Sequence, residues 1–370
     1  MNINTRTSLR QRLKASQVEL IDCLKTEQEP ITPALARLTY TLVWIRLEEF
    51  VREGCGIGCP PHARFALANA FVAKIVLRLA TTVALIDRLK VDISLRRICG
   101  FPRYRLLPSE STFSRAFEEF AKQELPQRVH EALIKEQLGQ ELIGHIARDA
   151  TAIEARERPT KGVTKVEPQV KQKRGRPSKA QGLQPKPPKE PSAIERQRGQ
   201  SLEQMMSELP NQCDTGVKCN AKGYKTSWNG YKLHLDTADC GVPISAILSS
   251  ASVYDSRVAV PLSILSAQRV TNLYDLMDAA YCSSELRQHS VQLNHMPLID
   301  HNRRGGEKIE FTPAQAQRYK ERTVAERMNA RLKDEFGGNN VWVRGAVKVS
   351  CHLMFGMLAL SADQLMRLLQ

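Results

Sequence analysis

The order of strands and helices beyond the first 140 residues constrains the fold of this 370-residue chain more than any other feature. Residues 141–154 change from a short apolar run to alternation, which predicts a strand from Ile146 to Ile153. Two apolar runs around a turn at Asp239–Gly241 predict a hairpin. Helix, strand, helix, strand and a long late helix follow. This α/β order predicts a mixed sheet with flanking helices.

The first part of the chain, residues 8–140, is predicted to be all helical, because apolar residues return every three or four positions. A short helix is expected to stop at Gly100 and Pro102, and the next to begin at an N-cap, Ser109. This pair is either a helix-turn-helix with its second helix in a DNA groove, or an ordinary helical hairpin with surface charge. Both interpretations stay open.

A membrane span is not expected. The most apolar run, Phe65–Ile86, is interrupted by Lys74 and Arg78, which favours one buried core helix.

Net charge points to acidic partners. The chain carries a formal charge of +15, and residues 155–200 hold thirteen Lys and Arg but only four Glu. An excess of this size favours nucleic acid over neutral small molecules. Within this segment Arg174 and Arg176 flank a Gly, and a Pro follows, which resembles an AT-hook. They could enter an A·T minor groove or attract phosphate without reading sequence.

Four residues of the late helix share one face. At about 100° per residue, Tyr319, Arg322, Glu326 and Lys333 fall within an arc of ~60°, opposite an apolar stripe. A single continuous helix would therefore pack on the core and present an aromatic ring, two cations and a carboxylate to a ligand.

Three acids lie where the sheet would gather them: Asp149 in the first strand, Asp278 after a later strand, and Glu326 on the helix. Hard carboxylate oxygens suit Mg²⁺ or Mn²⁺. Asp255 is a fourth candidate, as an N-cap or as a group supporting the metal ligands.

At these positions the chain resembles the DDE transposases of bacterial insertion sequences. The resemblance rests on four blocks: RDATAIEAR, the hairpin NGYKLHLDTADCGVPISAILSS, LMDAAYCSSEL, and the Tyr-x2-Arg-x3-Glu-x6-Lys signature. It covers roughly residues 90–360 and implies a ribonuclease-H-like fold. The strand insertion that some relatives carry before the catalytic Glu is absent from the short stretch between Asp300 and Tyr319.

The resemblance implies that Asp149, Asp278 and Glu326 are catalytic and hold two Mg²⁺ ions, with Mn²⁺ as an alternative. Arg322 and Lys333 would grip DNA phosphates, and Tyr319 would stack on a base or bond a phosphate. The partners implied are double-stranded DNA, as terminal inverted repeats and target, and a second copy of the chain in the synaptic complex. No membrane partner is implied, and the location would be the bacterial cytoplasm, at the nucleoid.

The expected domains follow from these patterns. Residues 1–140 would be a helical DNA-binding or dimerisation region, 141–345 the catalytic domain with a disordered basic insert at about 155–222, and 346–370 a C-terminal helix. Two other functions stay open: a metal-dependent nuclease on the same sheet, and a catalytically silent DNA-binding regulator.

Overall fold

The structure is a computed structural model. It describes residues 31–51, 62–103, 106–160, 191–219, 223–303 and 307–369. The AT-hook-like residues Arg174 and Arg176 lie outside the described residues.

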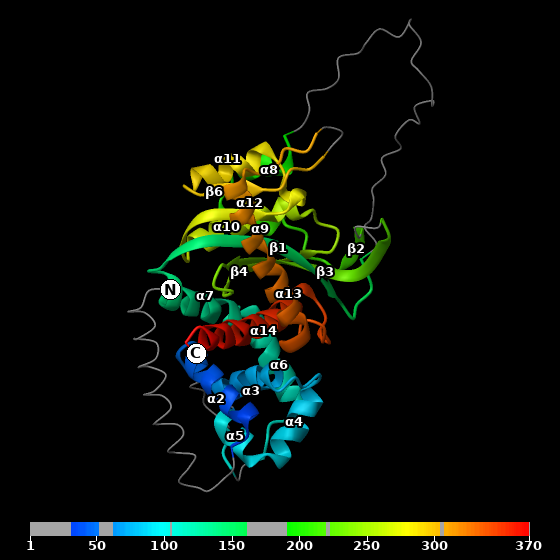
Figure 1. The fold of residues 1–370 in the computed structure, drawn as a ribbon. Helices are drawn as coiled ribbons and strands as arrows, with labels where there is room; N and C mark the ends of the chain where they lie inside the picture. The colour runs from blue at the N-terminus through cyan, green and yellow to red at the C-terminus, as the bar shows by residue number, and fades with distance from the viewer. Residues whose placement is uncertain are drawn as a thin grey trace, which may run out of the picture.

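One mixed sheet forms the centre of the C-terminal part (Figure 1). Its strands are β1 (Leu142–Glu154), β2 (Asp214–Cys219), β3 (Lys225–Ala238), β4 (Pro243–Ser250), β5 (Thr271–Met277) and β6 (Met296–Ile299). Strand β3 pairs antiparallel with β1, and β4 and β2 pair with the other edge of β3. On the far side, β5 runs parallel to β1 and β6 parallel to β5. This order, β4-β3-β1-β5-β6, confirms the ribonuclease-H-like expectation, including the hairpin at Asp239–Gly241.

Alternation along β1 sends neighbouring side chains to opposite faces of the sheet. Arg148 is buried on one face, where its guanidinium donates to both carboxylate oxygens of Asp236 at 2.8 and 2.7 Å. The hydroxyl of Ser266, on α10, donates to the same carboxylate. Asp149 therefore points to the other face, where α13 packs.

The helices of the C-terminal part cover both faces of the sheet. They are α8 (Ala193–Gln197), α9 (Leu202–Glu208), α10 (Asp255–Ala267), η2 (Ala279–Tyr281), α11 (Ser284–Gln292), α12 (Pro313–Tyr319), η3 (Lys320–Arg322), α13 (Thr323–Glu335) and α14 (Ala346–Arg367). The expected helices at α10 and α11 and the expected strands at β5 and β6 are confirmed.

The described N-terminal part is helical, as expected. Its elements are α2 (Pro33–Ile45), η1 (Leu47–Glu49), α3 (Arg64–Val76), α4 (Thr82–Val91), α5 (Ile93–Cys99), α6 (Glu110–Lys122) and α7 (Leu125–Leu138). Helix α5 ends at Cys99 and is capped by Gly100, which adopts φ 91°, and Ser109 is the N-cap of α6. Whether α5 and α6 bind DNA as a helix-turn-helix stays a prediction.

The expectation of one helix through Phe65–Ile86 is wrong. Helix α3 ends at Val76, and α4 begins only at Thr82, after Thr81 caps it by accepting a hydrogen bond from the Ala84 amide at 3.1 Å. A threonine N-cap stabilises a new helix start, so the apolar run divides there.

Helix α14 is the centre of the apolar core. Its length and composition would suffice to cross a membrane, but 83% of its most apolar window is buried inside the protein. Figure 1 shows it between the sheet and the N-terminal helices, and it packs on α2, α3, α6 and α7. One apolar cluster extends from Leu38 through Ile143 and Leu235 to Phe355, and so crosses both expected domain boundaries. Those boundaries therefore stay predictions about function and do not mark separate cores.

Part of the segment expected to be disordered is folded. Helices α8 and α9 and strand β2 lie within residues 191–219, so the expectation of disorder across 155–222 is wrong for these residues. Met205 and Leu209 are buried against α10 and its surroundings, and β2 pairs with β3. Sparse apolar residues can still order a segment when each finds a preformed surface. Residues 161–190 lie outside the described part.

Candidate active site

Strand register brings Asp149 and Asp278 together. Ala147 on β1 is paired with Leu276 on β5, and each aspartate lies two residues further along its own strand direction. Since side chains two residues apart share a face, both carboxyls point to the same side from neighbouring strands, which lie about 4.8 Å apart. Asp278 also caps η2, because its Oδ1 accepts a hydrogen bond from the Ala280 amide at 2.9 Å.

Burial of these two carboxyls disfavours their charged forms. It raises the pKa of Asp149 to about 6; the nearby charge of Asp278 adds to the rise, while Arg322 and Asn329 oppose it. Burial also raises the pKa of Asp278. The site is therefore short of positive charge, a deficit that a bound cation would relieve.

Glu326 reaches this region from α13, which crosses the sheet (Figure 1). Buried Ala325 packs on Ala147 of β1, and these small side chains let the helix approach the strand closely. Glu326 itself is exposed, and its Oε1 accepts a hydrogen bond from Arg322 Nη2 at 2.5 Å. Among the described residues, no three His, Cys, Asp or Glu side chains are grouped to hold a metal ion. The structure thus pairs the two aspartates and leaves Glu326 bound to arginine.

The late helix is not continuous, contrary to expectation. Helix α12 ends at Tyr319, a 3-10 turn spans Lys320–Arg322, and α13 begins at Thr323. Tyr319 is tied to the sheet, since its hydroxyl donates to the Met277 carbonyl at 3.1 Å and its ring packs 4.8 Å from that of Phe311. These contacts hold the segment to the end of β5 and accompany the break at η3.

The two expected phosphate-binding cations differ in their surroundings. Arg322 donates a hydrogen bond to Glu326 and lies near Asp149. Its positive charge opposes the rise in the pKa of Asp149 that burial causes. Lys333 is half-buried, and no carboxylate of the described part lies within ion-pair distance of its ammonium group. Burial lowers the pKa of Lys333, and the nearby Lys218 adds to this shift. Within the described part of the chain, Lys333 is therefore a cation without an ion-pair partner, near Asp149.

Asn329 is a site residue that the sequence analysis did not identify. Its Nδ2 donates to Asp149 Oδ2 at 3.0 Å, while its Oδ1 is buried and without a partner in the described structure. A buried amide oxygen without a partner is unfavourable in an apolar setting, but it is a suitable hard ligand for a divalent cation or its water. The signal in the sequence was an Asn one turn after Glu326.

Asp255 is not the N-cap of α10, because Tyr254 takes that position and Asp255 is the first helical residue. Its Oδ1 accepts a hydrogen bond from Lys232 Nζ at 2.8 Å, and its charge adds to the rise in the pKa of Asp278. Asp255 thus borders the site as one half of an ion pair.

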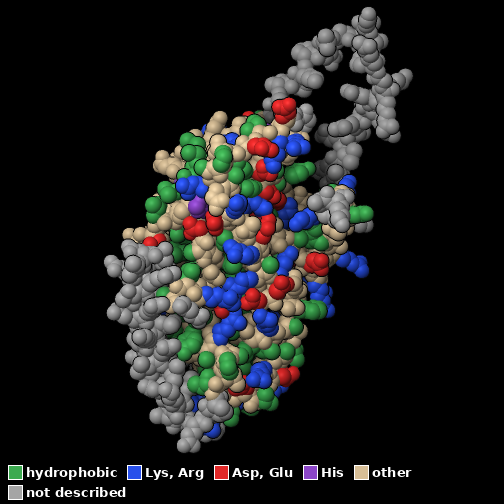
Figure 2. All heavy atoms as spheres, viewed as in Figure 1, with side chains coloured by type: hydrophobic (Ala, Val, Ile, Leu, Met, Phe, Trp, Pro, Cys, Tyr) green, Lys and Arg blue, Asp and Glu red, His purple; other side chains and the backbone are tan. Residues whose placement is uncertain are grey.

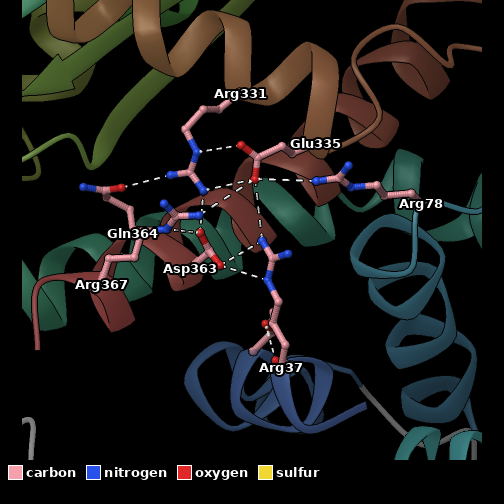
Figure 3. A network of polar contacts seen from close by, with 8 residues as sticks. Arg37, Arg78, Arg331, Glu335, Asp363, Gln364 and Arg367 are labelled. Carbon is pink, nitrogen blue, oxygen red and sulfur yellow. Dashed lines mark hydrogen bonds and ion pairs between the residues drawn. The ribbon is translucent and has the colours of Figure 1, made fainter. Parts of the chain in front are cut away.

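Helix α13 is fixed on its other side by a network of arginines and acids (Figure 3). Arg331 of α13 donates to Asp363 Oδ2 of α14 at 2.5 Å and to Glu335 Oε1 at 3.2 Å. Arg37 of α2 also bonds Asp363, at 2.9 Å, and Arg367 bonds it at 2.8 Å. The helix that carries Glu326 and Asn329 is therefore anchored to both the core helix and the N-terminal region.

Comparison with known protein families shows which family this chain belongs to. The family model described as Transposase DDE domain matches residues 143–362, which is more than half of the chain and includes all three acids. A second model, Transposase domain (DUF772), matches residues 24–119. No curated protein and no solved structure matches the chain. Mixed sheet, paired aspartates and family match agree, and the chain belongs to the DDE transposases of insertion sequences.

Proposed function

We propose that this transposase binds the terminal inverted repeats of its own element and cuts and joins DNA strands with Asp149, Asp278 and Glu326 as metal ligands. The observation that carries the proposal is the proximity of two partly buried carboxyls with raised pKa values, Asp149 within β1 and Asp278 directly after the paired strand β5. Two carboxyls in this state are typical of sites that are completed by a cation.

The residues present fit Mg²⁺, or alternatively Mn²⁺, bound as two ions. Asp149 and Asp278 offer hard oxygens, and the unpartnered Oδ1 of Asn329 lies on the residue that holds Asp149. Bound divalent cations would supply Lewis-acid activation of the attacking oxygen and charge stabilisation for the leaving oxygen.

Glu326 would join this set by exchanging Arg322 for metal. Their ion pair is partly exposed, with relative side-chain exposures of 20% for Arg322 and 51% for Glu326, and exposed pairs of this kind contribute little, about 0–1 kcal/mol. Breaking this ion pair would therefore cost little free energy, and it would free the Arg322 guanidinium to bind a DNA phosphate beside the reacting bond.

The other contacts position DNA. Lys333 would hold a backbone phosphate, because it already lies near Asp149 and has no ion-pair partner among the described residues. Tyr319 would offer its ring to a base, since its hydroxyl is engaged by Met277. Arg174 and Arg176 would add affinity that depends on salt. Figure 2 shows Lys and Arg side chains, interspersed with acids, across the face on which α13 lies.

The partners proposed are double-stranded DNA, as element ends and target, and a second copy of the chain when two ends are synapsed. We place the protein in the bacterial cytoplasm, at the nucleoid.

The test is cleavage and joining of a labelled element end by wild type and Glu326→Gln. We expect the variant to lose about 1,000-fold or more of both activities and to keep DNA binding. Glu321→Gln is the matched control, because Glu321 is an exposed glutamate of the adjacent turn η3 and should leave both activities unchanged. Equal cleavage by Glu326→Gln and wild type would show the assignment to be wrong.

The same assay separates the alternatives. Cleavage without any joined product in wild type would indicate a nuclease, and binding without metal-dependent cleavage would indicate a silent regulator.

A further inference from the structure

A cavity with both apolar and charged lining residues lies away from the three acids. Its volume is about 500 Å³, within the range of ligand pockets, and it is bounded by α3, α4, α6, the start of α14 and residues 342–344. In Figure 1 these elements meet where α6 approaches α14.

Lys74 of α3 lines this cavity as a buried cation that has no counter-ion among the described residues. Its relative exposure is 7%, and in the described structure its ammonium group has no hydrogen bond or ion pair. Burial lowers the pKa of Lys74 to about 8, and no carboxylate of the described part of the chain opposes the shift. Burying an unpaired charge is unfavourable, so such a lysine facing a cavity indicates an anionic ligand.

Apart from Lys74, the charged groups around the cavity are mostly cationic. Arg344 is exposed at the rim, and Lys348 pairs with Glu118 at 3.2 Å. Among the described lining residues the one carboxylate is Glu110. Burial, with the Lys74 charge adding, lowers the pKa of His352 to about 4, so this imidazole is neutral. No group in the described lining offsets Lys74.

An aromatic platform lies beside the cations. Trp342 is 48% exposed although it is large and apolar, and the Arg156 guanidinium lies 5.0 Å from its ring centroid. An exposed indole held next to an arginine is suited to stack on a nucleobase.

The cavity lies beyond the end of β1, the strand that carries Asp149. Arg156 follows the end of β1 at Glu154, and β1 carries Asp149. Lys333 lies near both Asp149 and Glu154, whose charges act on its pKa. Cations thus lead from the catalytic face along β1 to Lys74.

We propose that this cavity binds one nucleotide of the DNA strand that runs out of the catalytic site, with its phosphate on Lys74 and its base on Trp342. The proposal rests on the proposed function for the identity of the ligand as DNA. The Lys74 ammonium recognises the phosphodiester charge, and Trp342 accepts any base, so the contact fixes position without reading sequence.

The experiment measures equilibrium binding of a fluorescent element-end duplex in EDTA over a range of salt. Lys74→Met removes the charge and keeps the length of the side chain. We expect affinity to fall about tenfold at low salt and the magnitude of the slope of log affinity against log salt to decrease by about 0.9, the value for one phosphate contact. Lys135→Met is the control, because Lys135 is exposed on α7 and paired with Glu131. The salt slope measured for Lys135→Met should equal that of wild type.

A second variant tests the base contact. Trp342→Ala should weaken binding about tenfold and leave the salt slope unchanged, because stacking involves no counterion release. Lys74→Met should fold at least as well as wild type, since it removes a buried unpaired charge.

Several outcomes would overturn the proposal. One is wild-type affinity and slope in Lys74→Met; another is an equal slope change in Lys135→Met. Calorimetric binding of inorganic phosphate that Lys74→Met abolishes, with DNA binding unaltered, would assign the cavity to a small anion instead. Because EDTA prevents the reaction, these results do not depend on whether Glu326→Gln loses cleavage.

Discussion

Two groups of acids border helix α13, and their electrostatic surroundings are opposite. On one side, Asp149 and Asp278 have raised pKa values because burial outweighs the available positive charge. On the other, burial also acts on Asp363, but hydrogen bonding from Arg331 and the charges of Arg37 and Arg367 hold its pKa below the usual range. The pKa of Glu335 is lowered in the same way, chiefly by the hydrogen bond and charge of Arg331.

The difference distinguishes acids that stabilise the fold from acids that we propose to be catalytic. Asp363 is surrounded by donors within the protein and needs no further partner to hold α14, α13 and α2 together (Figure 3). Among the described residues Asp149 has one side-chain donor, Asn329, and its carboxylate keeps capacity for a ligand. The same helix thus has a satisfied face that fixes it and an unsatisfied face that we assign to chemistry.

The largest expected effect is that of Asp149→Asn. We expect cleavage of an element end to fall about 1,000-fold or more, because the proposed metal site would lose an anionic ligand. The free energy of unfolding at neutral pH should stay equal or rise, because the wild-type charge is disfavoured by burial. Urea unfolding and end cleavage, measured on the same preparation, check both. A clear loss of stability would mean that Asp149 is a structural acid like Asp363.

Asp363→Asn should have the converse effect. Removing the charge leaves Arg37, Arg331 and Arg367 with a weaker acceptor, so we expect a loss of about 2–4 kcal/mol in the free energy of unfolding. Activity should persist in the fraction that is folded.

Asp87→Asn is the matched control for this loss. Asp87 is exposed and pairs with exposed Lys90, so the change should stay within about 0.5 kcal/mol. A similar small value for Asp363→Asn would remove the contrast between the two acidic groups.

The smallest expected effect is on the pH dependence of stability in EDTA. The folded-state pKa of Asp149 is raised, so its stabilising contribution is full below the pKa of an unfolded aspartate and is lost as pH rises through about 6. The folded-state pKa of Asp363 is lowered, so its contribution is present above the unfolded value and is lost as pH falls through the folded one.

Unfolding free energies of the two variants against wild type check these signs. The difference for Asp149→Asn should change between about pH 4 and pH 6, and that for Asp363→Asn only below about pH 4. Identical profiles for the two variants would contradict the proposed difference in charge balance.

Sequence reasoning succeeded where local pattern and spacing carry the information. Alternation in β1, the turn at Asp239–Gly241 and the helical period of α13 are local properties, and all three elements are confirmed. Sequence reasoning failed where packing against a distant part of the chain decides whether a segment is ordered. Met205 and Leu209 order the segment 191–219 only because α10 and β4 provide a buried place for them.

The candidate site, too, could be predicted only in part from the sequence. Spacing identified Asp149, Asp278 and Glu326 as candidates, since each lies in a recognisable local setting. The break at η3 and the contact of Asn329 with Asp149 depend on how α12 and α13 meet the sheet. No local pattern reports on a hydrogen bond between residues 180 positions apart.

By itself the sequence determined most of the elements and their order, the excess of positive charge and the three candidate acids, because these follow from residue type and period. Only the tertiary structure decided which carboxyls lack compensating charge. The register of β1 on β5 pairs Asp149 with Asp278, and the packing of α13 assigns Arg322 to Glu326 and Arg331 to Asp363. The physical reason is that desolvation and charge pairing act through space, between residues that the chain brings together only on folding.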